Sequence, residues 1–318
     1  MYLVFTLTGY SLAMKKKMIM VKRKLEEKRM KKVITIVISL ILALAMFSGC
    51  TQTGFNQDTA ITVISREEGS GTRGAFIELF EIEQKNSEGV KVDRTIATAD
   101  INSSTGVVLA SVAQNMYSIG YISLGSLNDT VKALQVDGAD ATVENIKSGT
   151  YKVSRPFNIA VKEGLSEVAQ DFVNYILSKE GQAVVESAGY ISALTGDSYS
   201  GIKPSGTVTV AGSSSVTPVM EKLKEAYAVL NPNAVIEINQ SDSTTGINSA
   251  IEGICDIGMA SRTLKESEIE KGVTPTVIAI DGIAIIVNNE NPLTGMTKDE
   301  VTKIYIGEIT SWSEIGNE

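Results

Sequence analysis

Three segments of the sequence place glycine, serine and threonine between a short apolar run and an amphipathic one. They are Ser65 to Thr72, Ala211 to Pro218 and Gln240 to Gly246. In each, hydroxyl and backbone N–H groups fall at the predicted N-terminus of a helix, where the partial positive charge of the helix end favours an anion. Glycine lets a ligand approach the main chain, and Pro218 suits the first helical turn. The pattern predicts a set of anion-binding loops.

Each loop also has a structural interpretation. Serine and threonine are ordinary helix N-caps, so a single loop of this kind more often caps a helix than binds a ligand. Arg66 can hold a phosphate edge with two N–H groups, or it can form a surface salt bridge with Glu67 or Glu68. Three such loops in one chain favour binding. No GxxxxGK[ST] pattern is present, so these are not nucleotide P-loops. A fourth polar turn, 103–106, is interpreted as an N-cap.

The segments that would hold the loops alternate between strand and helix. Strand-like runs are 61–64, 118–122, 157–161, 208–210, 234–238, 276–280 and 283–287, and helical patterns begin near 71 and cover 168–188 and 247–254. The alternation predicts an α/β fold with largely parallel sheets. Thr195 to Gly206 is the one clear linker, rich in Gly, Ser and Asp.

Residues 1–49 are interpreted as a targeting segment with an over-long start, for which Met30 is the better initiator. Two lysines precede an apolar stretch, Val33 to Phe47, that is short of the roughly 20 residues of a membrane span. Small residues and Cys50 follow, which resembles a bacterial lipoprotein signal peptide. We therefore expect a lipid on Cys50 and a tether over 50–59. An uncleaved membrane anchor is the alternative, and either way the bulk of the chain lies outside the cytoplasm.

The composition excludes several functions. The chain is 43% hydrophobic and 21% charged, which is typical of a globular protein, and it has no histidine, the commonest general base. After residue 49 there are 19 basic and 35 acidic residues, a net charge of −16, which argues against nucleic-acid binding. An anion must then be held by local donors. We expect no metal, no cofactor and no catalysis; an enzyme acting on phosphate esters is a weak alternative. Cys255 is interpreted as a small buried residue.

Four segments together carry a family resemblance: Val208 to Pro218, Asp256 to Arg262, Asp281 to Ala284 and Arg66 to Thr72. They resemble the phosphate-binding proteins of bacterial high-affinity phosphate ABC importers, and the resemblance covers nearly everything after Cys50. It implies a two-lobed α/β fold of the type II periplasmic-binding-protein kind. Each lobe would have one mixed or parallel sheet with flanking helices, and the ligand would lie in the cleft between the lobes.

The resemblance also implies a function. We expect a monomeric, extracytoplasmic receptor, anchored to the outer face of the cell membrane, that binds inorganic phosphate and delivers it to the permease of an ABC importer. Binding of another tetrahedral oxyanion (sulfate, molybdate or tungstate) and a phosphate-sensing role at the surface are the alternatives. The phosphate ligands implied by position are Arg66, Ser70, Gly71, Thr72, Ser214, Ser215 and Ser243.

Selectivity is a separate question. Much of the family has an aspartate that accepts the proton of the phosphate, which rejects fully ionised sulfate because a buried acceptor would be left unpaired. Here Ser261 stands at that position, followed by Arg262, whose role is open between a ligand-lobe cation and a surface charge. Asp281 is our hypothesis for the acceptor, and a carboxylate that caps a turn is the alternative.

The order of the halves departs from the family. There, the segment resembling 207–318 comes first and the one resembling 61–194 follows. The sequence therefore resembles a circular permutant in which the linker at 195–206 joins the usual termini. A fragment of a tandem array or a misannotated frame is the alternative. We expect lobe one to comprise 60–154 and 290–318, and lobe two to comprise 155–289.

Overall fold

The computed structural model describes residues 54–193 and 196–316, together with positions 18, 20, 22, 23, 29 and 30. The chain divides into two compact units, Met1–Gly54 and Phe55–Glu318, and every element below belongs to the second. The predicted signal segment after residue 30, the predicted lipidation site Cys50 and residues 194, 195, 317 and 318 lie outside the described residues. No helix among the described residues has both the length and the apolar character needed to cross a membrane.

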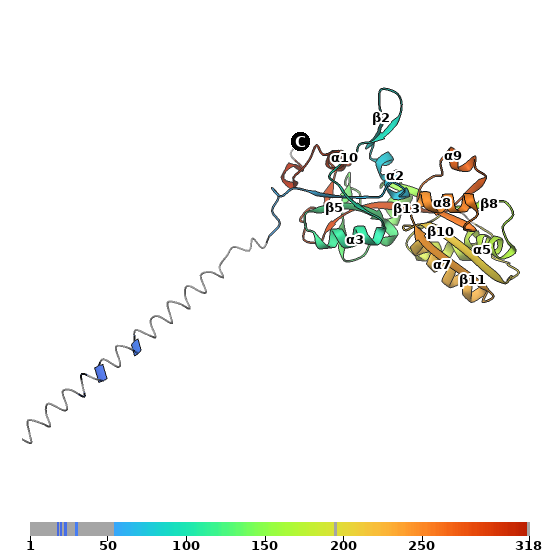
Figure 1. The fold of residues 1–318 in the computed structure, drawn as a ribbon, viewed down its shortest axis with the longest axis horizontal. Coiled ribbons are helices and arrows are strands. Elements are labelled where there is room, and N and C mark those ends of the chain that lie inside the picture. The colour runs from blue at the N-terminus through green and yellow to red at the C-terminus, as the bar shows by residue number, and fades with distance from the viewer. Residues whose placement is uncertain are drawn as a thin grey trace, which may run out of the picture. The chain divides into compact units, whose positions relative to one another are not determined.

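A ten-stranded mixed sheet forms the frame of the second unit (Figure 1). Eight strands follow the order β11-β10-β12-β8-β13-β5-β1-β4, and β6 and β9 also pair with β13. Their bounds are β1 (Thr62–Arg66), β4 (Asp100–Asn102), β5 (Ser118–Ser123), β6 (Val131–Ala133), β8 (Ser154–Lys162), β9 (Ile191–Ser192), β10 (Gly206–Ser213), β11 (Ala234–Ser241), β12 (Ile257–Ala260) and β13 (Val273–Asn288).

The pairing in this sheet differs from the expected largely parallel sheets. Strands run parallel only in the two outer groups, β11-β10-β12 and β5-β1-β4. The pairs β12-β8, β8-β13 and β13-β5 between them are antiparallel. Because β13 pairs with strands on both sides, hydrogen bonds join the two expected sheets into one. The α/β class is confirmed, and the sheet is mixed and continuous.

β13 corrects one prediction. Two strands, 276–280 and 283–287, were predicted here, and Asp281-Gly282 between them has residue types that are common in turns. Instead the strand continues for 16 residues. Asp281 pairs in register with Arg155 of β8, and Gly282 pairs with Ser154. The cross-strand ladder overrides the local turn preference.

The helix predicted over 168–188 is also corrected. It is two helices, α5 (Glu167–Leu177) and α6 (Lys179–Ser187), separated by Ser178 in an extended conformation (φ −74°, ψ 166°). The Ser178 hydroxyl accepts a hydrogen bond from the Gly181 N–H at 3.1 Å and so caps α6. The Ser178 hydroxyl bonds to the main chain as an N-cap and so ends the regular helical hydrogen bonding that the apolar pattern predicts.

Buried apolar side chains form two large core clusters. One packs β8, β10 and β12 against α5 and α7 (Thr217–Leu230), and the other packs β1 and β5 against α2 (Gly71–Leu79) and α10 (Lys298–Ile306). β13 contributes Ile278 and Ala279 to the first cluster and Ile283, Ile285 and Val287 to the second. Figure 1 shows α7 and β10 on one side of β13, and α3 (Thr105–Gln114) and β5 on the other.

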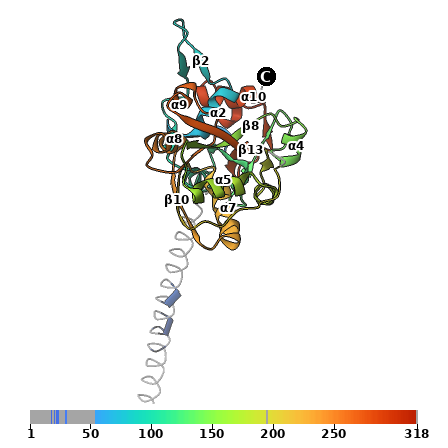
Figure 2. The ribbon, with the colours of Figure 1, turned by 90° about the vertical axis from the view of Figure 1, so that its right-hand side faces the viewer.

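A two-stranded hairpin projects from the body of the second unit (Figure 2). Its strands are β2 (Glu83–Lys85) and β3 (Lys91–Asp93), which pair antiparallel, and the hairpin follows α2 in the chain. Val90 and Val92 are 55% and 43% exposed. The hairpin therefore touches the body chiefly at its base.

Candidate anion-binding site

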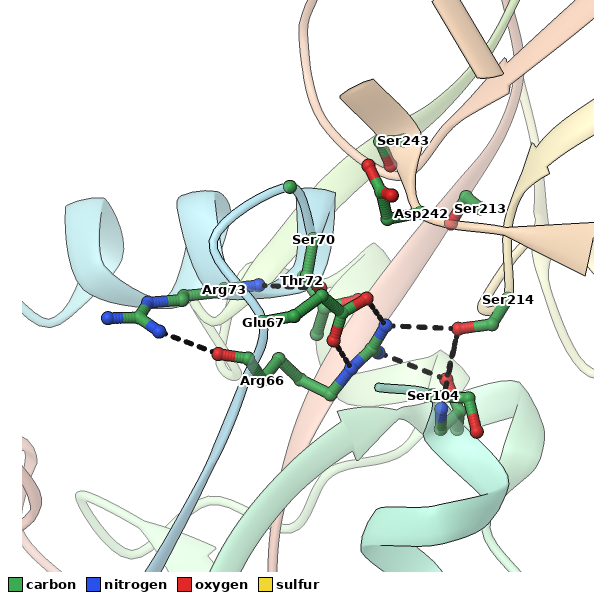
Figure 3. A network of polar contacts seen from close by, with 12 residues as sticks. Arg66, Glu67, Ser70, Thr72, Arg73, Ser104, Ser213, Ser214, Asp242 and Ser243 are labelled. Carbon is green, nitrogen blue, oxygen red and sulfur yellow. Dashed lines mark hydrogen bonds and ion pairs between the residues drawn. The ribbon is translucent and has the colours of Figure 1, made fainter. Parts of the chain in front are cut away.

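Four strand-turn-helix units meet at one place in the second unit. The helices are α2, α3, α7 and α8 (Ser243–Glu252), which follow β1, β4, β10 and β11 respectively. Since β1 pairs parallel with β4 and β10 with β11, the carboxyl ends of each pair lie at the same edge of the sheet. Figure 3 shows the residues that these turns bring together. Three of the four units are the loops that the sequence predicts.

Arg66 lies at the centre of the contacts and is 2% exposed. Its Nε and Nη2 atoms donate to the two carboxylate oxygens of Glu67, each at 2.7 Å. Nη2 also donates to Ser214 Oγ at 3.1 Å, and Nη1 donates to Thr105 Oγ1 at 3.4 Å (Figure 3). The salt bridge with Glu67 therefore exists, but the arginine in it is buried and faces the hydroxyls of two other loops.

A group of buried hydroxyl side chains surrounds this arginine, and each is at most 4% exposed. We call it the hydroxyl cluster; its members are Thr72, Thr105, Ser213, Ser214, Ser215, Ser243 and Ser261. Ser215 Oγ lies 2.8 Å from Thr72 Oγ1 and 3.0 Å from Thr105 Oγ1. A hydroxyl both donates and accepts, so the members of the cluster can hydrogen-bond to one another. The same O–H groups can rotate to donate to an anion.

Ser261 joins the cluster from the end of β12. Its hydroxyl accepts from Ser213 Oγ at 3.0 Å, and its N–H donates to Ser243 Oγ at 3.1 Å. The hydroxyls of Ser243 and Thr72 each lie 3.4 Å from Ser261 Oγ. The structure thus brings Ser261 together with the predicted residues of three loops.

The N-terminus of α2 packs closely against the α8 turn. Ser70 is the N-cap of α2 and accepts from the Arg73 N–H at 3.3 Å. The Gly69 carbonyl accepts from both the N–H and the hydroxyl of Thr244, at 3.2 and 3.1 Å. A Cβ on Gly71 would lie 2.3 Å from Ser243 Oγ and 2.8 Å from Ser261 Oγ. Glycine is therefore required here by close approach.

Asp281 and Arg262 lie in other surroundings. Asp281 is buried and accepts from Arg155 Nη2 at 3.1 Å and from the Gly125 N–H at 3.3 Å, groups outside the hydroxyl cluster. Burial raises the pKa of Asp281 to about 6, although Arg155 opposes the shift. Arg262 donates to both carboxylate oxygens of Glu268, at 2.9 and 2.7 Å, and to Thr244 Oγ1 at 3.3 Å.

Thr105 and Ser213 are the members of the hydroxyl cluster that sequence reasoning missed. Ser104 caps α3 by accepting from the Val107 N–H at 3.3 Å, as the N-cap interpretation of this turn requires. The next residue, Thr105, enters the hydroxyl cluster: its N–H lies 3.3 Å from Ser214 Oγ. The polar turn was visible in the sequence, but its place beside Arg66 depends on the pairing of β4 with β1.

Tyr121 of β5 hydrogen-bonds to the main chain of Arg66. The Arg66 N–H donates to the Tyr121 hydroxyl at 3.1 Å, and Ser65 Oγ lies 2.8 Å from the same oxygen. The Tyr121 ring stacks on Phe76 of α2 with centroids 3.9 Å apart. Burial raises the pKa of Tyr121, so its hydroxyl stays protonated.

We expect Tyr121→Phe to lower the free energy of unfolding by about 1–3 kcal/mol, because the buried Arg66 N–H would lose its acceptor while the ring packing remains. Urea unfolding of the variant and the wild type measures this difference. An unchanged midpoint would mean that the Arg66 N–H finds another partner.

The described residues also bear on metal binding and on the state of the Cys255 thiol. Within residues 54–193 and 196–316 no group of three or more Cys, Asp or Glu side chains is placed to hold a metal ion. Cys255 is buried, as predicted, and burial raises the pKa of its thiol to about 11. The thiol is therefore protonated and unreactive at neutral pH.

The comparisons with known proteins agree with this architecture. A family model for a PBP superfamily domain matches residues 42–180 and 197–318. That match and the α/β sheet define a substrate-binding protein of the PBP class. "Phosphate-binding protein PstS 2" of Streptococcus agalactiae serotype V is 52% identical over 290 residues, which are 91% of this chain and 99% of the relative.

A solved structure, that of a phosphate-binding protein of a phosphate ABC transporter from Streptococcus pneumoniae TIGR4, matches with a TM-score of 0.64 and 44% identity. The match covers 81% of this chain and 100% of that chain. The chain belongs to the family of phosphate-binding proteins of phosphate ABC transporters. The predicted family, and with it the prediction of a transport protein that is not an enzyme, is confirmed. "Phosphate-binding protein PstS" of Bacillus subtilis is 32% identical over 137 residues, only 42% of this chain and 46% of the relative.

Proposed function

We propose that this chain binds inorganic phosphate in the hydroxyl cluster beside Arg66 and delivers it, as a monomer, to the permease of an ABC importer. One observation carries the proposal: a buried arginine and four helix N-termini converge on buried hydroxyls in a body of net charge −16. An acidic body repels a phosphate anion at long range. Local donors must therefore supply the affinity, and here they are concentrated at one place.

The proposed ligands come from all four turns and from the end of β12. They are Arg66, Ser70, Gly71, Thr72, Thr105, Ser214, Ser215, Ser243 and Ser261. The arginine supplies charge-assisted hydrogen bonds, the hydroxyls supply donors, and the main chain at the helix ends supplies N–H groups. Because a hydroxyl also accepts, the cluster can pair with a protonated phosphate oxygen as well as with ionised ones.

We further propose that the second unit consists of two lobes that close on the ligand. The two large core clusters support this division, because β13 contributes to the first cluster only as far as Ala279 and to the second only from Ile283 onward. We place the crossing near Asp281 and Gly282, where β13 passes from one cluster to the other, rather than at the expected boundary after residue 289. Arg66, Thr72 and Thr105 would then face Ser214, Ser215, Ser243 and Ser261 across the cleft, the arrangement that closure requires.

Circular permutation remains part of the proposal, with the swapped order shared by the Streptococcus agalactiae relative that matches over 99% of its length. The contacts between the chain ends support it. The Ile61 N–H donates to the Thr310 carbonyl at 2.8 Å, and Ala60 forms a bridge with Ser311. New ends created by permutation must lie side by side in this way. The linker is also bonded to the body: Tyr199 Oη donates to Asp171 at 2.6 Å. The match to less than half of the Bacillus subtilis relative has the extent that one swapped half would give.

Calorimetric titration of the mature protein, residues 50–318, tests the proposal. We expect saturable heat with phosphate and much weaker binding of sulfate and molybdate. No phosphate-dependent heat at millimolar ligand would contradict it, and tighter binding of molybdate would assign the site to another oxyanion.

Asp281 remains our proposed acceptor of the phosphate proton, since its raised pKa of about 6 leaves it ionised but basic at neutral pH. The proposal requires its carboxylate to leave Arg155 and Gly125 and reach the anion when the lobes close. We expect Asp281→Asn to reduce the preference for phosphate over sulfate by at least roughly tenfold, because sulfate would no longer leave an acceptor unpaired. Parallel titrations with both anions at pH 7.5 measure it. An unchanged preference would exclude Asp281 and point to the Ser261 hydroxyl.

We also propose that a lipid on Cys50 anchors the protein to the outer face of the cell membrane. Cys50→Ser removes the acylated thiol, so we expect the protein to move from the membrane pellet to the soluble fraction after expression in a bacterium that processes lipoproteins. Mass spectrometry of the N-terminal peptide checks cleavage before Cys50. Membrane retention of the Ser variant would favour an uncleaved anchor.

A further inference from the structure

Arg73 lies in the first turn of α2, directly behind the loop that carries Arg66. Its N–H donates to Ser70 Oγ at 3.3 Å, and its Nη1 donates to the Arg66 carbonyl oxygen at 2.7 Å (Figure 3). Within residues 66–70 a main-chain hydrogen bond also runs from the Ser70 N–H to the Glu67 carbonyl at 3.0 Å. Arg73 thus bonds to both ends of the segment from Arg66 to Ser70, which we call the anion loop.

The other edge of the Arg73 guanidinium is held by the base of the projecting hairpin. Nε and Nη2 both donate to Asp93 Oδ2, at 2.9 and 2.8 Å. Asp93 Oδ1 accepts from the N–H and the hydroxyl of Thr95, at 2.8 and 2.6 Å. Burial alone would raise the pKa of Asp93, but the hydrogen bonds from Thr95 and Arg73 outweigh it and the pKa is lowered. Asp93 is therefore a fixed, ionised anchor.

We propose that Arg73 is a positioning residue for the anion site. With Asp93 as its anchor, it fixes the main chain at Arg66 and thereby the direction of the Arg66 guanidinium. A planar guanidinium can donate to the carboxylate on one edge and to the carbonyl on the other, which a single ammonium cannot do in the same geometry. A site whose donors are held before binding loses less entropy when the ligand arrives.

Two simpler roles would produce some of the same contacts. Arg73 could act only as a positive charge near an anion, or it could serve only to attach the hairpin to the body. A charge role predicts that lysine restores phosphate binding. An attachment role predicts a change in stability without a change in the Arg66 loop.

Four single variants separate these roles: Arg73→Gln, Arg73→Lys, Asp93→Asn and, as a matched control, Arg94→Gln. Arg94 lies next to Asp93 at the same hairpin base, and its Nη1 donates to Gln84 at 3.0 Å rather than to the anion loop. Its side chain is 41% exposed. The control therefore removes the same charge from the same place without touching Arg66.

The measurements are amide hydrogen exchange of residues 67–72 in phosphate-free protein and the phosphate dissociation constant. We expect both Arg73 variants to speed exchange in this loop and to weaken phosphate binding by roughly ten- to a hundredfold, the size expected for hydrogen bonds to a charged group. Asp93→Asn should act in the same direction but less strongly. In a double variant, it should add little to the effect of Arg73→Gln. Arg94→Gln should change neither quantity.

Loop exchange that is unchanged in Arg73→Gln would overturn the proposal whatever the affinity. Full recovery of phosphate binding in Arg73→Lys would show that Arg73 acts only through its positive charge, which would also overturn the proposal. Only the effect on affinity rests on the proposed function. If the wild type bound no phosphate, that function would fail, and the exchange measurement would still decide the role of Arg73.

Discussion

Replacing Arg66 with glutamine is expected to weaken phosphate binding by about a hundred- to a thousandfold, because truncating one partner of a buried charged contact costs about 2–5 kcal/mol. The guanidinium is buried and bonds to Glu67, Ser214 and Thr105. Its loss would remove charge-assisted donors and also leave the Glu67 carboxylate without its partner, which adds repulsion against the incoming anion.

Arg66→Lys keeps the positive charge but loses the planar guanidinium, which donates from several N–H groups at once. We therefore expect its phosphate affinity to lie between those of the wild type and the glutamine variant. Lys222→Gln is a suitable control, because Lys222 is an exposed cation on α7 that pairs with Glu225 at 3.0 Å. Calorimetric titration of the four proteins at constant ionic strength gives the comparison. Phosphate affinity within threefold of the wild type in Arg66→Gln would remove the arginine from the site.

The second large effect concerns Gly71. We expect Gly71→Ala to weaken phosphate binding more than roughly a hundredfold, since a Cβ there would lie 2.3 Å from Ser243 Oγ and 2.8 Å from Ser261 Oγ. The methyl group would either force the α2 and α8 turns apart or occupy space between ligand groups. The fold itself should tolerate the change, because alanine favours a helix over glycine by about 0.5–1 kcal/mol.

Gly74→Ala is the matched control in the same helix. A Cβ at Gly74 would lie 3.7 Å from Arg262 Cδ, which is an ordinary van der Waals contact. We expect this variant to bind phosphate within threefold of the wild type and to be more stable by up to about 1 kcal/mol, because alanine favours the helix. Equal affinities of the two alanine variants would show that the α2 N-terminus does not need its close approach to the α8 turn.

The parts of the site that sequence could predict are those determined locally. The loop from Arg66 to Thr72 and the turn holding Ser214 and Ser215 are identified by residue types that cap helices and bind anions. Such patterns span fewer than about ten residues, so no knowledge of strand pairing is needed. Their convergence on one place followed from the family resemblance, and the hydrogen bonds between the loops agree with it.

The parts that sequence could not predict depend on contacts between distant segments. Thr105 enters the hydroxyl cluster because β4 pairs with β1, and Tyr121 reaches the Arg66 N–H because β5 lies on the other side of β1. Asp281-Gly282 has the composition of a turn but continues a strand, since Arg155 and Ser154 pair with it. In each case tertiary pairing decided what local propensity left open.

The most direct test of the account is a crystal structure of residues 51–318 grown with saturating phosphate. We predict density for one tetrahedral anion in the hydroxyl cluster, within hydrogen-bond distance of Arg66, Thr72, Ser215 and Ser243, and contacted from the N-termini of α2, α7 and α8. Phosphate bound elsewhere on the second unit, with the hydroxyl cluster still closed on itself, would contradict it.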